Sequence, residues 1–279
     1  FFFQAEDGIR YFCLSRGLGD VYKRQPYLGM EHQSAVAYGN KYKKGYLGMD
    51  LSGTGAGLFF DYITIHETGH EWFGNSITSK DIADMWIHEG FTTYTETVFI
   101  ECIKGYDQAI KYVNGQARNV QNDRPIIGQF GVNREGSGDM YYKGALLLNT
   151  IRHIINDDVK WWKLLYSYSE TYKKQIIDTK TVIDFFNKES GLDLTSVFLQ
   201  YLTTTKIPKL VLSKTGNKLN YKWENVNADF KMPIDIIINE KTLRLQTTAE
   251  NQELKIDKKL VLEDISVKTN QFYIKVEKK

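Results

Sequence analysis

Three side chains in one short segment have the types and the spacing of a metal site. His66 and His70 are four residues apart in the run His66-Glu67-Thr68-Gly69-His70. On a helix that spacing places both imidazoles on one face, where they can reach a single metal ion. Glu67 is turned about 100° away from His66 by the helical period, so it can stand beside the metal without binding it. This arrangement is typical of a zinc hydrolase.

Two imidazoles leave a catalytic zinc ion one protein ligand short of the usual three. Glu89 follows His70 after eighteen residues and can supply the third ligand, which leaves the fourth position for water. Zinc lowers the pKa of its bound water to about 7, and Glu67 can accept the water's proton and later deliver it to the leaving amine. The alternative is an ordinary helix with two surface histidines. The nearby acid and the aromatic surroundings favour one zinc ion, with the ligands His66, His70 and Glu89.

Two helices must hold these side chains. An apolar pattern of helical period covers residues 58–73, and we expect this helix to carry both histidines. A second helix is predicted from residue 84 or 86 to residue 102, with Glu89 near its start. Upstream, residues 34–39 are typical of an edge strand, and residues 41–57, rich in Gly, Ser and Thr, indicate a loop or hairpin.

The rest of the chain divides into a helical part and a strand part. Apolar stripes of helical spacing predict five further helices, over residues 107–120, 145–155, 161–172, 179–191 and 193–201. From residue 207 the pattern changes to short alternating runs, over residues 210–212, 218–223, 234–238, 243–245, 260–262 and 272–276. A turn at Thr215-Gly216-Asn217 joins the first two as a hairpin. We therefore predict an α+β protein, with a mainly helical catalytic domain over residues 26–206 and a small antiparallel β-sandwich over residues 207–279.

Composition indicates a packed globular protein and argues against several kinds of partner. The 279-residue chain is 14% aromatic, and 36 Lys and Arg nearly balance 34 Asp and Glu, for a net charge of +2. That balance gives no electrostatic basis for binding nucleic acid or an anionic membrane. The two cysteines, Cys13 and Cys102, cannot form a disulfide framework or a cysteine zinc site. No apolar run is long enough for a transmembrane segment.

Residues 1–25 differ in character from the rest of the chain. They begin Phe-Phe-Phe-Gln-Ala-Glu-Asp-Gly-Ile-Arg, which resembles translated sequencing-adapter read-through at the ends of genes assembled from environmental DNA. We expect this segment to be non-native and the native protein to start upstream, and we exclude it from the fold prediction. The alternative is a genuine amphipathic N-terminal segment.

Three motifs, in this order along the chain, resemble the gluzincin zinc aminopeptidases of the aminopeptidase N family. The first is Leu-Gly-Met-Glu-His at residues 28–32, which is similar to the family's G-x-M-E-N motif. The second is His-Glu-x-x-His at residues 66–70, with Glu89 beyond it. The third is Tyr-Tyr-Lys-Gly at residues 141–144, which is similar to the family's Y-x-K-G block. The resemblance covers about residues 26–212.

The resemblance implies a thermolysin-like zinc peptidase domain and a role for each motif residue. In the family, the glutamate of G-x-M-E-N binds the free α-amino group of a peptide, so Glu31 implies peptide substrates with a free N-terminus. Gly29 and Met30 are then substrate-binding neighbours. Tyr141 is the implied hydrogen-bond donor to the oxyanion, a contact that strengthens as negative charge develops.

Two positions depart from the family motif: Leu28 stands where the family has glycine, and His32 where it has asparagine. For His32, a polar contact to substrate and a structural role both stay open, with the structural role favoured. The implied function is a zinc aminopeptidase that hydrolyses the N-terminal peptide bond, with Glu67 as general base. A gluzincin endopeptidase would share the zinc site but have no use for Glu31. A non-catalytic zinc-binding or peptide-binding relative is the third possibility, and the intact Glu67 and Tyr141 argue against it.

Overall fold

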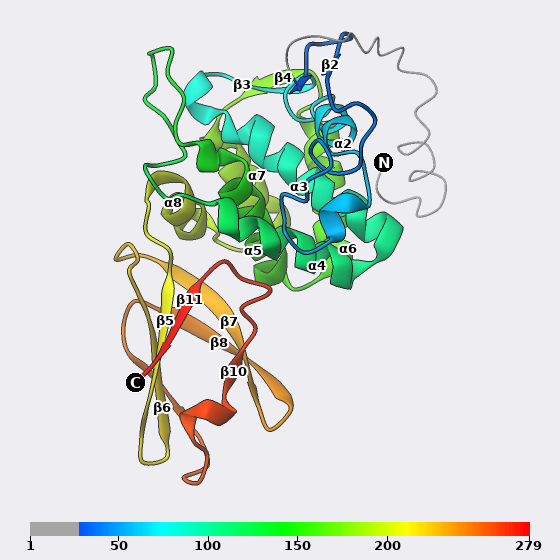
Figure 1. The fold of residues 1–279 in the computed structure, drawn as a ribbon. Coiled ribbons are helices and arrows are strands. Elements are labelled where there is room, and N and C mark those ends of the chain that lie inside the picture. Colours follow the sequence, from blue (N-terminus) through cyan, green and yellow to red (C-terminus); the bar gives the residue numbers. More distant parts are fainter. Residues whose placement is uncertain (1–27) are drawn as a thin grey trace.

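The computed structural model describes residues 28–279, and in them a mainly helical part is followed by a part made of strands (Figure 1). The prediction for residues 1–25 lies outside this range. The α-helices are α2 (Tyr62–Gly69), α3 (Trp86–Lys104), α4 (Tyr106–Gly115), α5 (Tyr142–Ile155), α6 (Asp158–Thr171), α7 (Thr179–Ser190) and α8 (Thr195–Thr203). The strands are β1 (Gly29–Met30), β2 (Ala37–Tyr38), β3 (Ile77–Ser79), β4 (Gln175–Ile177), β5 (Lys209–Thr215), β6 (Lys218–Glu224), β7 (Lys231–Ile238), β8 (Lys241–Thr248), β9 (Gln252–Lys255), β10 (Ser266–Val267) and β11 (Lys275–Lys278). The mixture of helices and strands agrees with the predicted α+β class.

Helix α2 is shorter than the helix predicted over residues 58–73. It begins after Asp61, whose side-chain oxygen accepts a hydrogen bond from the backbone N–H of Thr64 over 3.2 Å. An N-cap of this kind fixes where a helix begins. The residues before Asp61 therefore lie outside α2, although they share its apolar pattern. Asn40 Nδ2 donates to the same carboxylate over 2.7 Å, which ties the start of α2 to the chain after β2. His70 is the C-cap of the helix and keeps helical backbone angles.

Helix α3 is the central element of the helical part, and its prediction is confirmed. Most of its residues are buried, because α2, α4 and α5 all pack against it. Trp86 Nε1 donates to the hydroxyl of Thr179 over 2.6 Å, and that hydroxyl donates to the buried carboxylate of Asp84 over 2.6 Å. These bonds fix the start of α3 to the start of α7. Glu89, one turn inside α3, therefore stands on a rigid support.

The remaining predicted helices are also present, as α4 to α8. The helix predicted over residues 107–120 divides in two, because α4 ends at Gly115 and a 3-10 helix, η3 (Gln116–Asn119), follows it. No helix within residues 28–279 combines the length and the apolar character needed to cross a membrane.

The strand part forms a three-stranded sheet in the order β10-β7-β8 and a four-stranded sheet in the order β11-β5-β6-β9. The predicted hairpin between β5 and β6 is confirmed. The prediction of purely antiparallel pairing is wrong for one pair, because β11 lies parallel to β5, with Lys275 opposite Lys209. Residues 260–262 were predicted as a strand but form none. A 3-10 helix, Leu262–Asp264, begins at the last of them.

One hydrophobic cluster runs from the helices into the sheets. It includes Phe91 of α3 and Phe198 of α8, together with Leu210 and Trp223 from β5 and β6. At the same junction, Arg244 of β8 donates to the backbone oxygen of Ile154 over 3.0 Å. The connection between α8 and β5 contains the predicted boundary after residue 206, and a division into two domains at that point stays a prediction.

Candidate functional site

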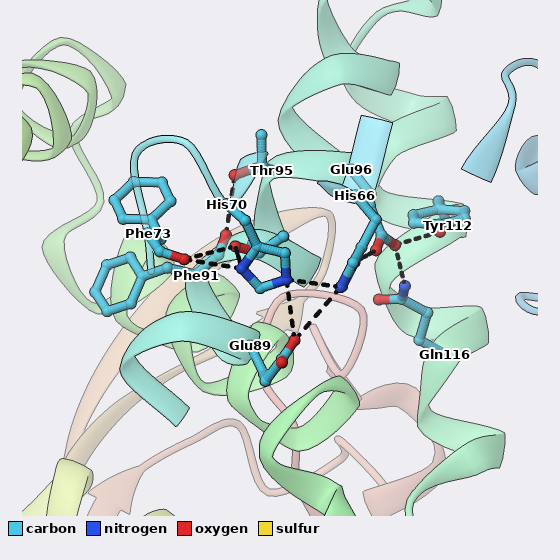
Figure 2. Close-up of polar contacts among 10 residues, drawn as sticks. His66, His70, Phe73, Glu89, Phe91, Thr95, Glu96, Tyr112 and Gln116 are labelled. Carbon is cyan, nitrogen blue, oxygen red and sulfur yellow. Dashed lines mark hydrogen bonds and ion pairs between the residues drawn. The ribbon is translucent and has the colours of Figure 1, made fainter. Parts of the chain in front are cut away.

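Helices α2 and α3 bring together the three predicted metal ligands (Figure 2). The Nε2 atoms of His66 and His70 are 3.2 Å apart. Glu89 Oε2 lies 3.4 Å from each of these nitrogens. All three side chains are buried. Three ligand atoms thus form a nearly equilateral triangle at the contact between the two helices.

The size of this triangle fits a zinc ion. Zinc binds imidazole nitrogen and carboxylate oxygen at about 2.0–2.2 Å, and tetrahedral geometry then places neighbouring ligand atoms about 3.3–3.5 Å apart. The observed separations of 3.2 and 3.4 Å match this requirement closely. His88, which lies in the first turn of α3, is not part of the triangle. Its Nε2 accepts a hydrogen bond from the N–H of Ser79 over 2.8 Å.

Each histidine of the triangle has its other ring nitrogen held by a hydrogen-bond acceptor. His66 Nδ1 lies 2.7 Å from Glu96 Oε1, and His70 Nδ1 lies 2.9 Å from the backbone oxygen of Phe73 (Figure 2). In the neutral imidazole an acceptor at Nδ1 keeps the proton there, so each Nε2 can then point a lone pair into the triangle. Two lone pairs and a carboxylate at this separation repel one another unless a cation lies between them.

The electrostatics of the triangle also favour positive charge. Burial acts to lower the pKa of His66, but the nearby carboxylates of Glu89 and Glu96 outweigh burial and raise that pKa well above its usual value. Burial acts to raise the pKa of Glu89, but the two imidazoles outweigh it and hold that pKa well below its usual range. Glu89 Oε2 is buried and has no hydrogen-bond partner among the described residues. The donor set therefore fits a divalent cation such as zinc.

Glu67 stands beside the triangle without being part of it. The side chain is buried, and its Oε2 has no hydrogen-bond partner in the described part of the chain. Burial raises the pKa of this carboxyl to about 7. Gly29 of β1 packs directly on Glu67, because a Cβ built on Gly29 would overlap Glu67 Oε1. The carboxyl group is thus confined at a position where it can exchange protons.

A cleft of about 510 Å³ opens beside the triangle. Apart from Glu67 and His66, its walls are apolar or aromatic. The lining residues are Leu28, Gly29, Tyr46, Leu51, Tyr62, Ile63, His66, Glu67, Tyr141 and Tyr142. The cleft thus joins residues from the predicted substrate-binding motif, the predicted base and the Tyr-Tyr-Lys-Gly segment in one space.

Tyr141 lies on the cleft side of the triangle. Its ring is stacked on the imidazole of His66, with 6.0 Å between ring centroids. Burial and the nearby Glu89 carboxylate raise the pKa of Tyr141 far above its usual value. The phenol therefore stays protonated and is available as a hydrogen-bond donor.

Two glycines let the helices that carry Glu89 and Tyr141 approach closely. Gly90 of α3 lies against Gly144 of α5, where a Cβ built on Gly144 would be only 2.8 Å from the Gly90 Cα atom. Side-chain carbons do not come this close to backbone atoms, so the crossing needs glycine. Glu89 and Tyr141 flank the crossing, which therefore sets the distance between them.

Replacing Gly144 by alanine is expected to push α5 away from α3. Overpacking of this kind costs about 1–3 kcal/mol, and we expect the free energy of unfolding to fall by that amount in denaturant titrations. Gly138→Ala is the matched control, because a Cβ there would meet nothing within 4 Å. Equal stability of the two variants would show that the glycine crossing is not needed.

Besides Glu67, Glu31 also places a carboxylate next to the triangle. Together with Glu67 and His70 it forms a group whose possible ligand atoms all lie within 4.8 Å of one another. The backbone oxygen of Glu31 accepts a hydrogen bond from Asn75 Nδ2 over 3.0 Å, which ties the end of β1 to the turn after α2. Two carboxylates this close together favour a cation between them.

The other residues of the Leu-Gly-Met-Glu-His motif have different surroundings. Gly29 and Leu28 line the cleft. Met30 lies in β1 with 38% of its surface exposed, and His32 is exposed in the turn that follows. The structure therefore brings Glu31 and Gly29 to the candidate site, whereas His32 lies outside it.

Sequence reasoning missed the residues that support the triangle from behind. Glu96 holds His66, and Tyr112 and Gln116 both donate to Glu96. The only signal available was spacing, because Glu96 follows Glu89 by seven residues, or two helical turns, and so lies on the same face of α3. Asn75, which holds Glu31, gave no signal of its own in the sequence.

Comparisons with known proteins identify the family of this chain. Residues 26–201 match the model of the peptidase family M1 domain. The chain is 24% identical over 232 residues to probable aminopeptidase 2 of Sulfurisphaera tokodaii, covering 76% of this chain and 29% of that protein. It is 25% identical over 138 residues to aminopeptidase B of Mus musculus, covering 44% of this chain and 21% of that protein. The chain thus spans less than a third of the length of these curated relatives.

Solved structures show the same fold. Legionella pneumophila aminopeptidase A, in complex with aspartic acid, superposes with a TM-score of 0.66 at 15% identity, covering 91% of this chain and 31% of that one. A mutant M1 zinc metallopeptidase from Deinococcus radiodurans, bound to a Tyr-Ser-Ala substrate, gives a TM-score of 0.51 at 21% identity, covering 66% of this chain and 38% of that one. Because the family model matches more than half of the 279 residues, the chain belongs to peptidase family M1.

Proposed function

We propose that this chain is the catalytic part of a zinc aminopeptidase, with one zinc ion held by His66, His70 and Glu89. The observation that carries the proposal is the triangle of their ligand atoms, 3.2 and 3.4 Å on its sides, whose size and charge suit zinc. The aminopeptidase names of the relatives support the same activity. We assign catalysis to residues 26–206 and a supporting role to residues 207–279.

Glu67 is the proposed general base and acid. Zinc, when bound, supplies the Lewis acidity that makes water nucleophilic near neutral pH and polarises a carbonyl group. Glu67 takes a proton from the attacking water and passes it to the nitrogen of the leaving amine when the peptide bond breaks. The proposal is supported by the position of this carboxyl beside the triangle and by its pKa, which burial raises to about 7.

Tyr141 is the proposed donor to the carbonyl oxygen of the scissile bond. That oxygen gains negative charge as water adds to the carbonyl carbon, so a hydrogen bond to it is stronger in the transition state than in the bound substrate. The raised pKa of the Tyr141 phenol, caused by burial and by Glu89, keeps its proton in place for this contact.

Glu31 is the proposed ligand of the substrate's α-ammonium group, with Gly29 and Met30 beside it. A peptide offers a single cation of this kind, at its amino end, so a carboxylate at this position selects peptides with a free N-terminus. The proposal is supported by the group that Glu31, Glu67 and His70 form within 4.8 Å, because two carboxylates there favour a bound cation.

A matched pair of peptides tests this selection. We expect the zinc-loaded chain to cleave a free-amine peptide roughly 30-fold or more faster than its N-acetylated twin, since a hydrogen bond to a charged group contributes about 2 kcal/mol. In the Glu31→Gln variant the free-amine peptide is expected to lose this advantage, with zinc content unchanged. The acetylated peptide serves as the internal control for general damage to the site.

The same experiment separates the alternatives. Equal cleavage of the two peptides would favour an endopeptidase over an aminopeptidase. Failure of the zinc-loaded chain to cleave either peptide would favour the non-catalytic relative. Metal analysis of the folded chain tests the metal site itself, for which we expect one equivalent of zinc. A folded chain without stoichiometric zinc would contradict the proposed metal site.

A further inference from the structure

Glu96 is buried behind the triangle of His66, His70 and Glu89, and it takes no part in the proposed catalytic steps. Building on the proposed function, we propose that Glu96 is a positioning residue that fixes the proton and the ring orientation of His66 for zinc. Tyr112 and Gln116 hold Glu96 in turn. Together these three residues form a support for one ligand that reaches from α3 to α4 and η3 (Figure 2).

The first observation is the contact between Glu96 and His66. Glu96 is completely buried, with 0% of its surface exposed, and its Oε1 lies 2.7 Å from His66 Nδ1. The bond therefore lies on the side of the imidazole that faces away from the triangle. A carboxylate at this position keeps the proton on Nδ1 and makes the opposite Nε2 a better electron donor.

The second observation is that Glu96 is itself fully supplied with donors. Its Oε2 accepts from the hydroxyl of Tyr112 over 2.5 Å and from Gln116 Nε2 over 3.0 Å. Tyr112 and Gln116 are four residues apart, so they reach the carboxylate from adjacent turns. Both are almost completely buried. Since an ionised carboxylate only accepts hydrogen bonds, three donors around Glu96 hold it in one orientation.

The third observation is the contrast between the two histidines. His70 is held through the backbone oxygen of Phe73, over 2.9 Å, which is a neutral acceptor that no substitution of Phe73 removes. His66 depends on a charged side chain instead. The ring of Tyr62 also stacks on His66, with 5.4 Å between centroids, but stacking does not select which nitrogen carries the proton. Glu96 is therefore the residue whose replacement should affect zinc through His66.

Zinc affinity of the folded chain tests the role of Glu96. We expect Glu96→Gln, which keeps the size of the side chain but removes its charge, to raise the zinc dissociation constant about 10-fold to 100-fold in competition with a chromophoric chelator. Tyr112→Phe leaves Glu96 in place with one donor fewer, and we expect a smaller increase. Thr97→Val is the matched control on α3, because its hydroxyl is buried without a partner among the described residues.

A second readout needs no metal. In the metal-free wild-type chain, at a pH high enough for the imidazole of His66 to be neutral, we expect nitrogen chemical shifts in NMR spectra to show its single ring proton on Nδ1. In Glu96→Gln we expect a mixture of the two tautomers, whereas Thr97→Val should match the wild type. A residue that only stabilises the packing of α3 on α4 would lower the melting temperature without changing the tautomer.

The outcomes separate this inference from the proposed function. If the wild-type chain does not bind one equivalent of zinc, the proposed metal site fails. If the wild type binds zinc and both Glu96→Gln and Tyr112→Phe bind it equally tightly, the positioning role of Glu96 is overturned. The same conclusion follows if Thr97→Val weakens zinc binding as much as Glu96→Gln does.

Discussion

Replacing Glu67 by glutamine is expected to abolish peptide hydrolysis while zinc stays bound. The amide has nearly the same size as the carboxyl, so it fits the space between α2 and Gly29, but it cannot accept a proton from water. General acid–base catalysis contributes about 10²-fold to 10⁴-fold, and in the proposed mechanism Glu67 serves both proton transfers. We therefore expect kcat to fall toward the upper end of that range, measured alongside the zinc content of the variant.

The same substitution at Glu170, an exposed residue of α6, is the control for the chemical change. We expect Glu170→Gln to leave both kcat and zinc content at the wild-type values. Glu67→Gln with substantial activity would rule out Glu67 as the base. Loss of zinc from Glu67→Gln would instead mean that Glu67 supports the metal site.

Replacing Tyr141 by phenylalanine is expected to depress turnover much more than substrate binding. The substitution removes only the hydroxyl group, so the ring can remain stacked on His66 at 6.0 Å. A lost oxyanion donor costs about 2.7–4 kcal/mol, which is about 10²-fold to 10³-fold in kcat. KM and zinc content should change little, because the hydrogen bond is made chiefly in the transition state.

Tyr142 supplies the comparison, because it is the neighbouring tyrosine and also borders the cleft. We expect Tyr142→Phe to change kcat by less than a factor of ten. A large loss of kcat in Tyr142→Phe with none in Tyr141→Phe would reverse the assignment. A rise in KM with unchanged kcat in Tyr141→Phe would indicate that this hydroxyl binds the substrate in its ground state.

The grouping of the proposed metal ligands could be predicted from sequence because the helical period alone brings His66 and His70 to one face. Glu89 required a second helix, and the apolar pattern predicted that helix nearly to its ends. Glu96 could not be recognised in the same way. In the sequence it is one of many acids on helices, and its burial depends on Tyr112 and Gln116, which reach it only once α4 packs against α3.

The fold could be predicted for elements whose residue pattern lies within one short segment. It could not be predicted where strands far apart in the chain pair with each other. Helix α2 starts later than its apolar pattern because Asp61 caps it. Strand β9, Gln252–Lys255, has no β-branched or aromatic residue and forms through its pairing with β6. The parallel contact of β11 with β5 joins residues more than sixty positions apart, and no pattern within either strand encodes it. The glycine crossing of α3 and α5 likewise becomes visible only in three dimensions.

The proposed activity of this chain is the zinc-dependent removal of residues from the amino end of peptides. Mass spectrometry of an unlabelled peptide of about ten residues, followed over time with the zinc-loaded chain, tests it most directly. We expect a ladder of products shortened one residue at a time from the amino end, and no ladder after zinc is removed by a chelator. Internal fragments, or a ladder shortened from the carboxyl end, would contradict it.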